Sequence, residues 1–120
     1  MIREKDIEQY LVRKVRELGG IAYKFVSPGH AGAPDRLVCF PGGYQCFVEL
    51  KAPGKKTRPL QDVEIRKLRD LGFRVFVADS HEQVDDMLDW ARSARDSWQA
   101  SIREIKRRMP VRWEDNSDGL

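Results

Sequence analysis

A hairpin signal near the middle of the chain constrains the fold more than any other feature of the sequence. Two apolar runs rich in β-branched and aromatic residues, 36–40 and 44–50, flank the turn Pro41-Gly42-Gly43. This combination predicts two antiparallel strands joined by a tight loop. Antiparallel pairing brings the start of the first strand beside the end of the second. The sequence therefore predicts that Asp35 lies close to Glu49.

The other segments predict a mixed α/β domain, because apolar residues at helical spacing alternate with short β-branched runs and with loops rich in Gly and Pro. In chain order we expect a helix over 3–18, a strand over 21–26, a loop over 27–34, strands over 36–40 and 44–50, a loop over 52–59, a helix over 60–72, a strand over 73–78, and a helix that is capped by Ser80 and runs to about residue 107. The order α-β-β-β-α-β-α predicts a mixed central sheet flanked by helices. The helix between the last two strands predicts that they are parallel and joined by a right-handed crossover.

Apolar spacing also predicts the buried face of the helix over 60–72. Residues at intervals of about three and four share one side of a helix. The predicted face consists of Leu60, Val63, Leu68 and Leu71.

The chain has 120 residues, of which 34% are charged, and this length and composition favour one globular domain. No apolar run approaches the roughly 20 residues that span a bilayer, and the N-terminus has no signal-peptide pattern. We therefore expect a cytoplasmic protein, with a domain over residues 1–109 and a flexible tail over 110–120. Cys39 and Cys46 lack the paired spacing of a zinc site, so we expect reduced thiols in the core.

The net charge of +3 permits nucleic-acid binding without requiring it. The distribution of charge is more informative, because Lys55, Lys56 and Arg58 follow closely on the predicted meeting point of Asp35 and Glu49. These three residues are expected to contact phosphates. A second basic cluster, over 103–108, is expected to be a solvated helix surface.

The chemistry depends on three charged residues at this meeting point. Alternation along a strand places Glu49 and Lys51 on one face, and taken alone this pair predicts only a surface ion pair. Asp35 changes the interpretation, because two carboxylates held close repel each other unless a cation or a proton intervenes. Hard oxygen ligands of this kind suit Mg²⁺ or Mn²⁺.

These motifs resemble those of the VRR-NUC family in the PD-(D/E)XK nuclease superfamily. The matching elements are the PD of Pro34-Asp35, the (D/E)xK of Glu49-x-Lys51, the glutamine Gln61 on the next helix, and the acidic Glu8 on the first helix. The resemblance extends over about residues 4–88. Each motif is short, but their order and spacing together are specific.

The resemblance implies a restriction-endonuclease-like core and a metal-dependent endonuclease that hydrolyses phosphodiester bonds of DNA. Selectivity for junction or flap DNA is a further expectation. Asp35, Glu49 and the backbone carbonyl of Leu50 would bind one Mg²⁺ or Mn²⁺.

The remaining catalytic residues are also implied by the resemblance. Lys51 would orient or activate the attacking water, and Gln61 would position that water or a phosphate. Glu8 would reach the metal through a water or hold Lys51, with a solvated helix carboxylate as the alternative. In the loop over 27–34, the small size of Gly29 and Gly32 is expected to let the backbone approach the metal or the sugar-phosphate chain closely. His30 would contact phosphate, with a solvated loop histidine as the alternative.

Two other interpretations remain open. A junction resolvase that acts as a dimer would use the same active-site residues, and the resemblance to stand-alone family members favours a homodimer and a phage or bacterial source. A non-catalytic nucleic-acid-binding or assembly protein on a nuclease-like scaffold is less favoured, because Asp35, Glu49 and Lys51 are all present.

Overall fold

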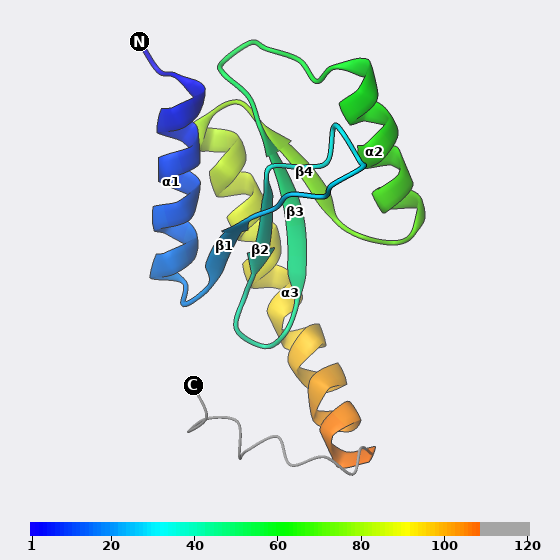
Figure 1. The fold of residues 1–120 in the computed structure, drawn as a ribbon. Helices are drawn as coiled ribbons and strands as arrows, with labels where there is room; N and C mark the ends of the chain where they lie inside the picture. The colour runs from blue at the N-terminus through cyan, green and yellow to red at the C-terminus, as the bar shows by residue number, and fades with distance from the viewer. Residues whose placement is uncertain (109–120) are drawn as a thin grey trace.

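The computed structural model describes residues 1–108, except for the side chains of residues 95–102, as a sheet with helices on both faces (Figure 1). The elements are α1 (Glu4–Glu17), β1 (Ile21–Lys24), β2 (Arg36–Cys39), β3 (Gln45–Leu50), α2 (Pro59–Asp70), β4 (Val75–Ala78) and α3 (His81–Arg108). The predicted order of helices and strands is confirmed. The expected tail over 110–120 lies outside the described residues.

The sheet has four strands in the order β1-β2-β3-β4. The first two pairs are antiparallel, and β3 and β4 are parallel, as the intervening helix predicted. In the β2–β3 hairpin, Arg36 lies opposite Val48 and Cys39 lies opposite Gln45. The residue before β2 therefore lies beside the last residues of β3, and the predicted hairpin is confirmed.

Strand β1 ends two residues earlier than predicted. The Phe25 N–H still donates to the Asp35 carbonyl at 2.9 Å. Beyond this bond, the segment between β1 and β2 is rich in Gly and Pro, which favours a loop over a regular strand. The chain therefore leaves the sheet at this point and enters the loop that leads to Asp35.

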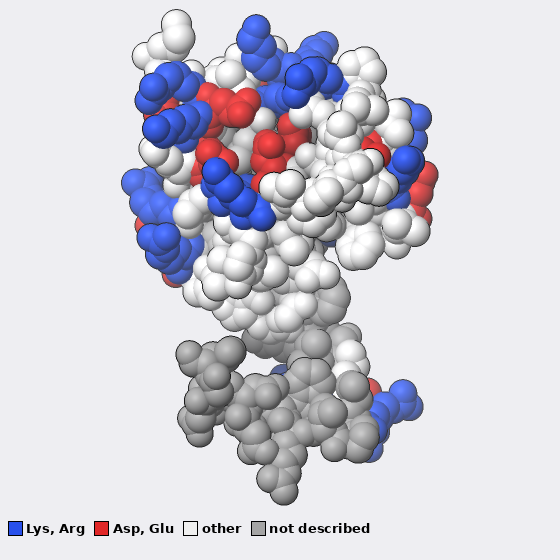
Figure 2. All heavy atoms as spheres, viewed as in Figure 1, with Lys and Arg blue, Asp and Glu red and all other residues white. Residues whose placement is uncertain are grey.

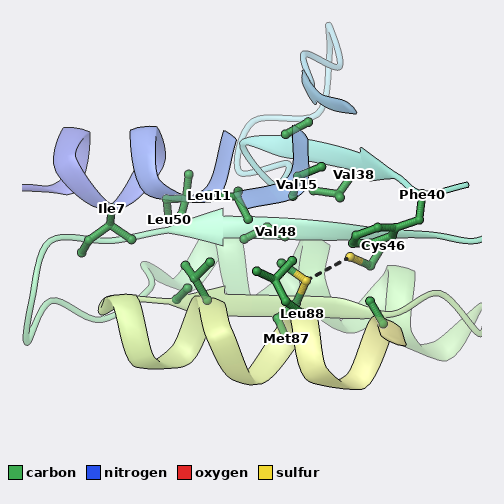
Figure 3. Packing of buried hydrophobic residues seen from close by; sticks show 14 of the residues in the cluster. Ile7, Leu11, Val15, Val38, Phe40, Cys46, Val48, Leu50, Met87 and Leu88 are labelled. Carbon is green, nitrogen blue, oxygen red and sulfur yellow. Dashed lines mark hydrogen bonds between the residues drawn. The ribbon is translucent and has the colours of Figure 1, made fainter. Parts of the chain in front are cut away.

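The main core lies between one face of the sheet and the helices α1 and α3. Figure 3 shows side chains from α1, β3 and α3 pointing toward one another. The helices contribute Ile7, Leu11, Val15, Val84, Met87, Leu88 and Ala91, and the sheet contributes Ala22, Val38, Cys46, Val48, Leu50 and Ala78. Burial of this apolar surface is the main stabilising contribution to the fold.

The opposite face of the sheet carries a smaller cluster beneath α2. Its buried members are Phe47, Ile65 and Val75, and Leu68 packs against them. The predicted apolar face of α2 is largely wrong, because Leu60, Val63 and Leu71 are 55%, 44% and 76% exposed. The helix instead turns Gln61 and Ile65 inward, four residues apart and therefore on one side.

Both cysteines are free thiols. Cys46 is buried, and its Sγ lies 3.9 Å from Sδ of Met87, the contact that is dashed in Figure 3. Burial raises the pKa of the Cys46 thiol to about 12. Cys46 is therefore a packing residue at neutral pH, since a thiolate is needed for nucleophilic or metal-binding chemistry. Cys39 is only half-buried.

Helix α3 is longer than the sheet that it covers. Its 28 residues correspond to a length of about 42 Å, and its second half continues beyond the sheet in Figure 1. Its start is capped as predicted, because the Gln83 N–H donates to Oγ of Ser80 at 3.1 Å. None of the helices described within residues 1–108 is long and apolar enough to cross a bilayer.

The observed orientation of α2 predicts different costs for two alanine substitutions. Ile65→Ala should lower the free energy of unfolding by about 2–4 kcal/mol, because a buried side chain is removed. Val63→Ala should change it by about 0.5 kcal/mol or less, because Val63 is exposed and lies outside the buried cluster beneath α2. Urea unfolding of both variants checks the orientation, and equal costs would contradict it.

Candidate active site

Asp35 lies at the C-terminal end of β3, as the hairpin predicted. Its Oδ2 accepts a hydrogen bond from the Leu50 backbone N–H at 2.9 Å. Its own carbonyl accepts from the Phe25 N–H. Asp35 is therefore fixed between β1 and β3, with its carboxylate beside the last residues of β3.

Glu49 is a buried carboxylate, with only 2% of the residue exposed. Its Oε2 accepts a hydrogen bond from Nε2 of Gln61 at 2.7 Å and lies 3.5 Å from Nζ of Lys51. Its Oε1 is also buried, and no donor within the described part of the chain reaches it. The Glu49–Lys51 pair is therefore no surface ion pair, because Lys51 is buried as well.

The surroundings of Glu49 disfavour its charged form. Burial raises the pKa of the carboxyl group, and the nearby charge of Asp35 raises it further, while Lys51 lowers it. The net result is a pKa of about 7. A carboxyl group in this state is stabilised in its charged form by any cation that binds between it and Asp35.

Gln61 connects this carboxylate to the first turn of α2. Its Nε2 donates to Glu49, and its Oε1 accepts from the Arg58 backbone N–H at 2.9 Å. The two contacts fix the orientation of the amide, since the nitrogen can only donate and the oxygen can only accept. Gln61 therefore holds Glu49 in place and caps α2 at the same time.

The donor set at this site fits a hard divalent cation. The unpartnered Oε1 of Glu49 is a buried acceptor, which is costly unless a donor or a cation occupies it. Within residues 1–108 no group of three or more histidine, cysteine or acidic side chains is arranged to hold a metal. A cation bound by Asp35 and Glu49 would therefore keep several waters, which is the usual state of Mg²⁺ in proteins.

Glu8 contacts an arginine rather than Lys51. Its Oε2 accepts from Nη2 and Nε of Arg36 at 3.1 and 3.3 Å. The expectation that Glu8 holds Lys51 is wrong, because the acidic partner of Lys51 is Glu49 on its own strand. Arg36 was missed in the sequence, although its position directly after Asp35 in a strand could have indicated it.

Gly32 makes the predicted close approach, but to the protein's own backbone. It has a φ of +91°, and a Cβ at this position would lie 2.8 Å from the Leu60 carbonyl oxygen and 3.0 Å from the Gln61 nitrogen. The loop before Asp35 therefore packs directly on the first turn of α2. His30, in the same loop, is exposed, and its Nδ1 lies 3.7 Å from Oε1 of Glu64.

The predicted basic residues Lys55, Lys56 and Arg58 are exposed in the loop between β3 and α2. Figure 2 shows acidic side chains gathered at the end of the molecule where α1 and α2 begin, with basic side chains around them. Positive charge around an acidic centre is an arrangement that can bind a polyanion and still concentrate cations at the centre.

Two contacts that the sequence did not predict shape this basic loop. The Gly54 N–H donates to Oδ2 of Asp79 at 3.1 Å, and Oγ1 of Thr57 donates to Oδ1 of Asp62. The second contact joins residues five apart, and a Thr-Arg-Pro run before a helix could have indicated it. The first joins distant segments and has no local signal.

The chain is similar to known proteins in sequence and in fold. The chain is 56% identical over 82 residues to a protein named "Putative nuclease p44" of Acyrthosiphon pisum secondary endosymbiont phage 1, over 68% of this chain and 88% of that protein. It is also similar to a solved structure described as a VRR_NUC domain, with a TM-score of 0.69 and 36% identity, over 74% of this chain and 97% of that one. No protein-family model matches the sequence.

The contact between Gly32 and α2 predicts unequal costs for two glycine substitutions. Gly29 has a φ of +83° with open space around it, so Gly29→Ala should cost about 1 kcal/mol of backbone strain. Gly32→Ala should cost about 1–3 kcal/mol more, because the new methyl group overlaps backbone atoms that cannot rotate away. Thermal unfolding of the pair measures the difference, and equal melting temperatures would contradict the contact.

The raised pKa of Glu49 predicts how stability depends on pH in EDTA. The folded protein holds the proton up to a pKa of about 7, whereas the unfolded chain releases it near 4.5. Folding is therefore linked to proton uptake between these values, and the contribution of Glu49 to stability falls as pH rises through this window. The loss is on the order of 2–3 kcal/mol.

Glu49→Gln is the matched control, because its amide does not titrate. Relative to this variant, the wild type should become less stable as pH rises from 4.5 to 7. Urea unfolding at several pH values measures it. A difference that stays constant across the window would show that the pKa of Glu49 is not raised.

Proposed function

Because this chain belongs to the VRR-NUC family of nucleases, we propose that it is a metal-dependent endonuclease that hydrolyses phosphodiester bonds of DNA. The observation that carries the proposal is the buried Glu49, which has an unpartnered oxygen, lies near the Asp35 carboxylate and pairs with Lys51. A carboxylate pair needs a cation to be stable when both groups are charged.

The proposed ligands of the cation are the carboxylates of Asp35 and Glu49 and the carbonyl of Leu50. The Leu50 N–H donates to Asp35, and a residue in a strand directs its N–H and its C=O to the same side, which supports the carbonyl as a ligand. A bound Mg²⁺ or Mn²⁺ would polarise the phosphodiester and lower the pKa of a coordinated water.

Lys51 supplies a fixed positive charge at the reacting centre. Its Nζ lies 3.5 Å from Oε2 of Glu49, and burial of both side chains strengthens their interaction. The ammonium group can donate a hydrogen bond to the attacking water and offset the negative charge that develops on the phosphate. Gln61 keeps the Glu49 carboxylate in one orientation throughout.

The substrate contacts are proposed to come from the rim of the site. The loop cations Lys55, Lys56 and Arg58 are exposed and can bind phosphates on either side of the scissile bond. His30 is a further candidate contact in the neighbouring loop. We include selectivity for junction or flap DNA and action as a homodimer in the proposal, since cutting both strands of a symmetric substrate requires two sites.

The proposal is tested by cleavage of labelled single strands, duplex, flap and four-way-junction DNA with Mg²⁺, Mn²⁺ or EDTA. The wild type should cut only with metal. Asp35→Asn and Lys51→Ala should each lower the rate by at least about 100-fold, because each removes a group that acts on the reacting centre.

Lys67→Ala is the matched control for Lys51→Ala, because Lys67 is an exposed lysine that pairs with Glu64 on α2. It should leave cleavage within about twofold, as most surface ion pairs contribute little. DNA binding without cleavage under every metal condition would favour a non-catalytic scaffold. Metal-dependent cleavage that persists in Lys51→Ala would place the reaction elsewhere.

A further inference from the structure

The loop between β3 and α2 is attached to the end of β4 by one side chain. Strands β3 and β4 are parallel and end together, with Leu50 opposite Ala78. The two chain segments separate beyond this point, but the Gly54 N–H donates to Oδ2 of Asp79 at 3.1 Å. Among the described residues, no other hydrogen bond joins residues 52–56 to a distant part of the chain.

The other hydrogen bond of this segment lies within the turn itself. The Lys55 N–H donates to the Ala52 carbonyl at 2.9 Å, and Gly54 has a φ of +79°. These features give the turn its local shape. They do not attach it to the sheet, because both partners of the bond belong to the turn. The attachment in the middle of the loop therefore depends on Asp79.

Asp79 is held firmly by the start of α3. Its N–H donates to Oε1 of Gln83 at 2.7 Å, and the Gln83 N–H donates to Oγ of Ser80 at 3.1 Å. Reciprocal bonds of this kind fix the chain where a helix begins. The Asp79 carboxylate is therefore a fixed acceptor to which the loop is bound.

Two exposed lysines directly follow the attached residue. Lys55 and Lys56 come after Gly54, and neither has an acidic partner within the described part of the chain. The loop is held again at its far end, where Oγ1 of Thr57 donates to Oδ1 of Asp62. The two lysines therefore lie between two points of attachment, and their charges are available to phosphates.

The charge of Asp79 and its hydrogen bond have opposite effects on DNA binding. A carboxylate near the lysines weakens the positive potential that attracts phosphates. A loop that is ordered before binding strengthens binding, because the DNA does not bear the entropic cost of ordering it. Removal of the side chain therefore shows by the sign of its effect which contribution is larger.

We propose that Asp79 is a positioning residue that holds the loop between β3 and α2 in place, so that Lys55 and Lys56 are ordered for contact with DNA phosphates before DNA binds. The inference rests on the proposed activity on DNA. It assigns to an acidic residue a favourable part in binding a polyanion, through the Gly54 N–H.

Two substitutions of Asp79 separate the hydrogen bond from the charge. Asp79→Ala removes both and should weaken binding of a labelled four-way junction in EDTA by at least about fivefold. Asp79→Asn keeps an oxygen that can accept from Gly54, so it should bind at least as tightly as the wild type. Fluorescence anisotropy measures binding, and thermal unfolding confirms that each variant is folded.

Asp86→Ala is the matched control for the loss of charge. Asp86 is an exposed aspartate of α3 whose side chain makes no ion pair or hydrogen bond with the described residues. Its removal should leave binding within about twofold of the wild type, because an exposed charge is screened by salt.

The lysines provide a second test, since Asp79 is proposed to act through them. The variant with Lys55→Ala and Lys56→Ala should bind the junction more weakly than the wild type. Addition of Asp79→Ala to this variant should cause no further loss. With Mn²⁺ and saturating DNA, the cleavage rate of Asp79→Ala alone should stay within about twofold of the wild type, with the effect confined to KM.

Limited trypsin digestion tests the attachment of the loop without DNA. Trypsin cuts after lysine, and a folded chain is cut where it opens locally. Cleavage after Lys55 or Lys56 should be at least about threefold faster in Asp79→Ala than in the wild type, and unchanged in Asp79→Asn. Mass spectrometry identifies the fragments.

Asp79→Ala that binds the junction as tightly as the wild type, or more tightly, would overturn the proposal. A further loss of binding on adding Asp79→Ala to the lysine variant would also overturn it, because Asp79 would then act elsewhere. Equal rates of digestion would show that Asp79 does not hold the loop. A wild type that neither binds nor cleaves DNA would instead overturn the proposed function, and the role of the lysines with it.

Discussion

The buried carboxylate of Glu49 is the constraint on which the rest of the site depends. It lies in β3 between the buried apolar residues Val48 and Leu50, where an uncompensated charge would cost several kcal/mol. Each compensating group comes from a different place: Lys51 from the end of the same strand, and Gln61 from the first turn of α2. The hairpin brings Asp35 close to Glu49, and the negative charge of Asp35 further disfavours the charged form of Glu49. The two carboxylates are stable side by side only when a cation or a proton is present, which supports the proposed metal site.

The features that could be predicted from the sequence are those set by local pattern. The Pro-Gly-Gly turn and the alternation of the flanking strands determine the register of β2 and β3, and the register alone brings Asp35 to the end of β3. The orientation of α2 could not be predicted in this way. Apolar spacing favours Leu60 and Val63 as the buried face, but the helix is rotated so that Gln61 reaches Glu49. A hydrophobicity pattern contains no information about a buried carboxylate on another element.

The choice of ion-pair partners also depends on the tertiary structure and not on local sequence. Lys51 has acidic residues available at two sequence distances, Glu49 two positions away and Glu8 on the first helix. The choice depends on which face of the sheet each element covers, and only the assembled structure places Glu8 over Arg36. The tether between Gly54 and Asp79 is also non-local, since the two residues follow different strands. The family resemblance predicted which residues form the candidate site, whereas their contacts depend on the packing of the helices on the sheet.

The absence of a side chain at Gly32 has a mechanical consequence. Its backbone lies so close to Leu60 and Gln61 that the loop carrying Asp35 and the helix carrying Gln61 cannot slide past each other. Asp35 and Glu49 are therefore positioned by segments that pack directly on each other. Under the proposed activity on DNA, substrates of different curvature would be accommodated by the exposed side chains around the site and not by movement of this loop against α2.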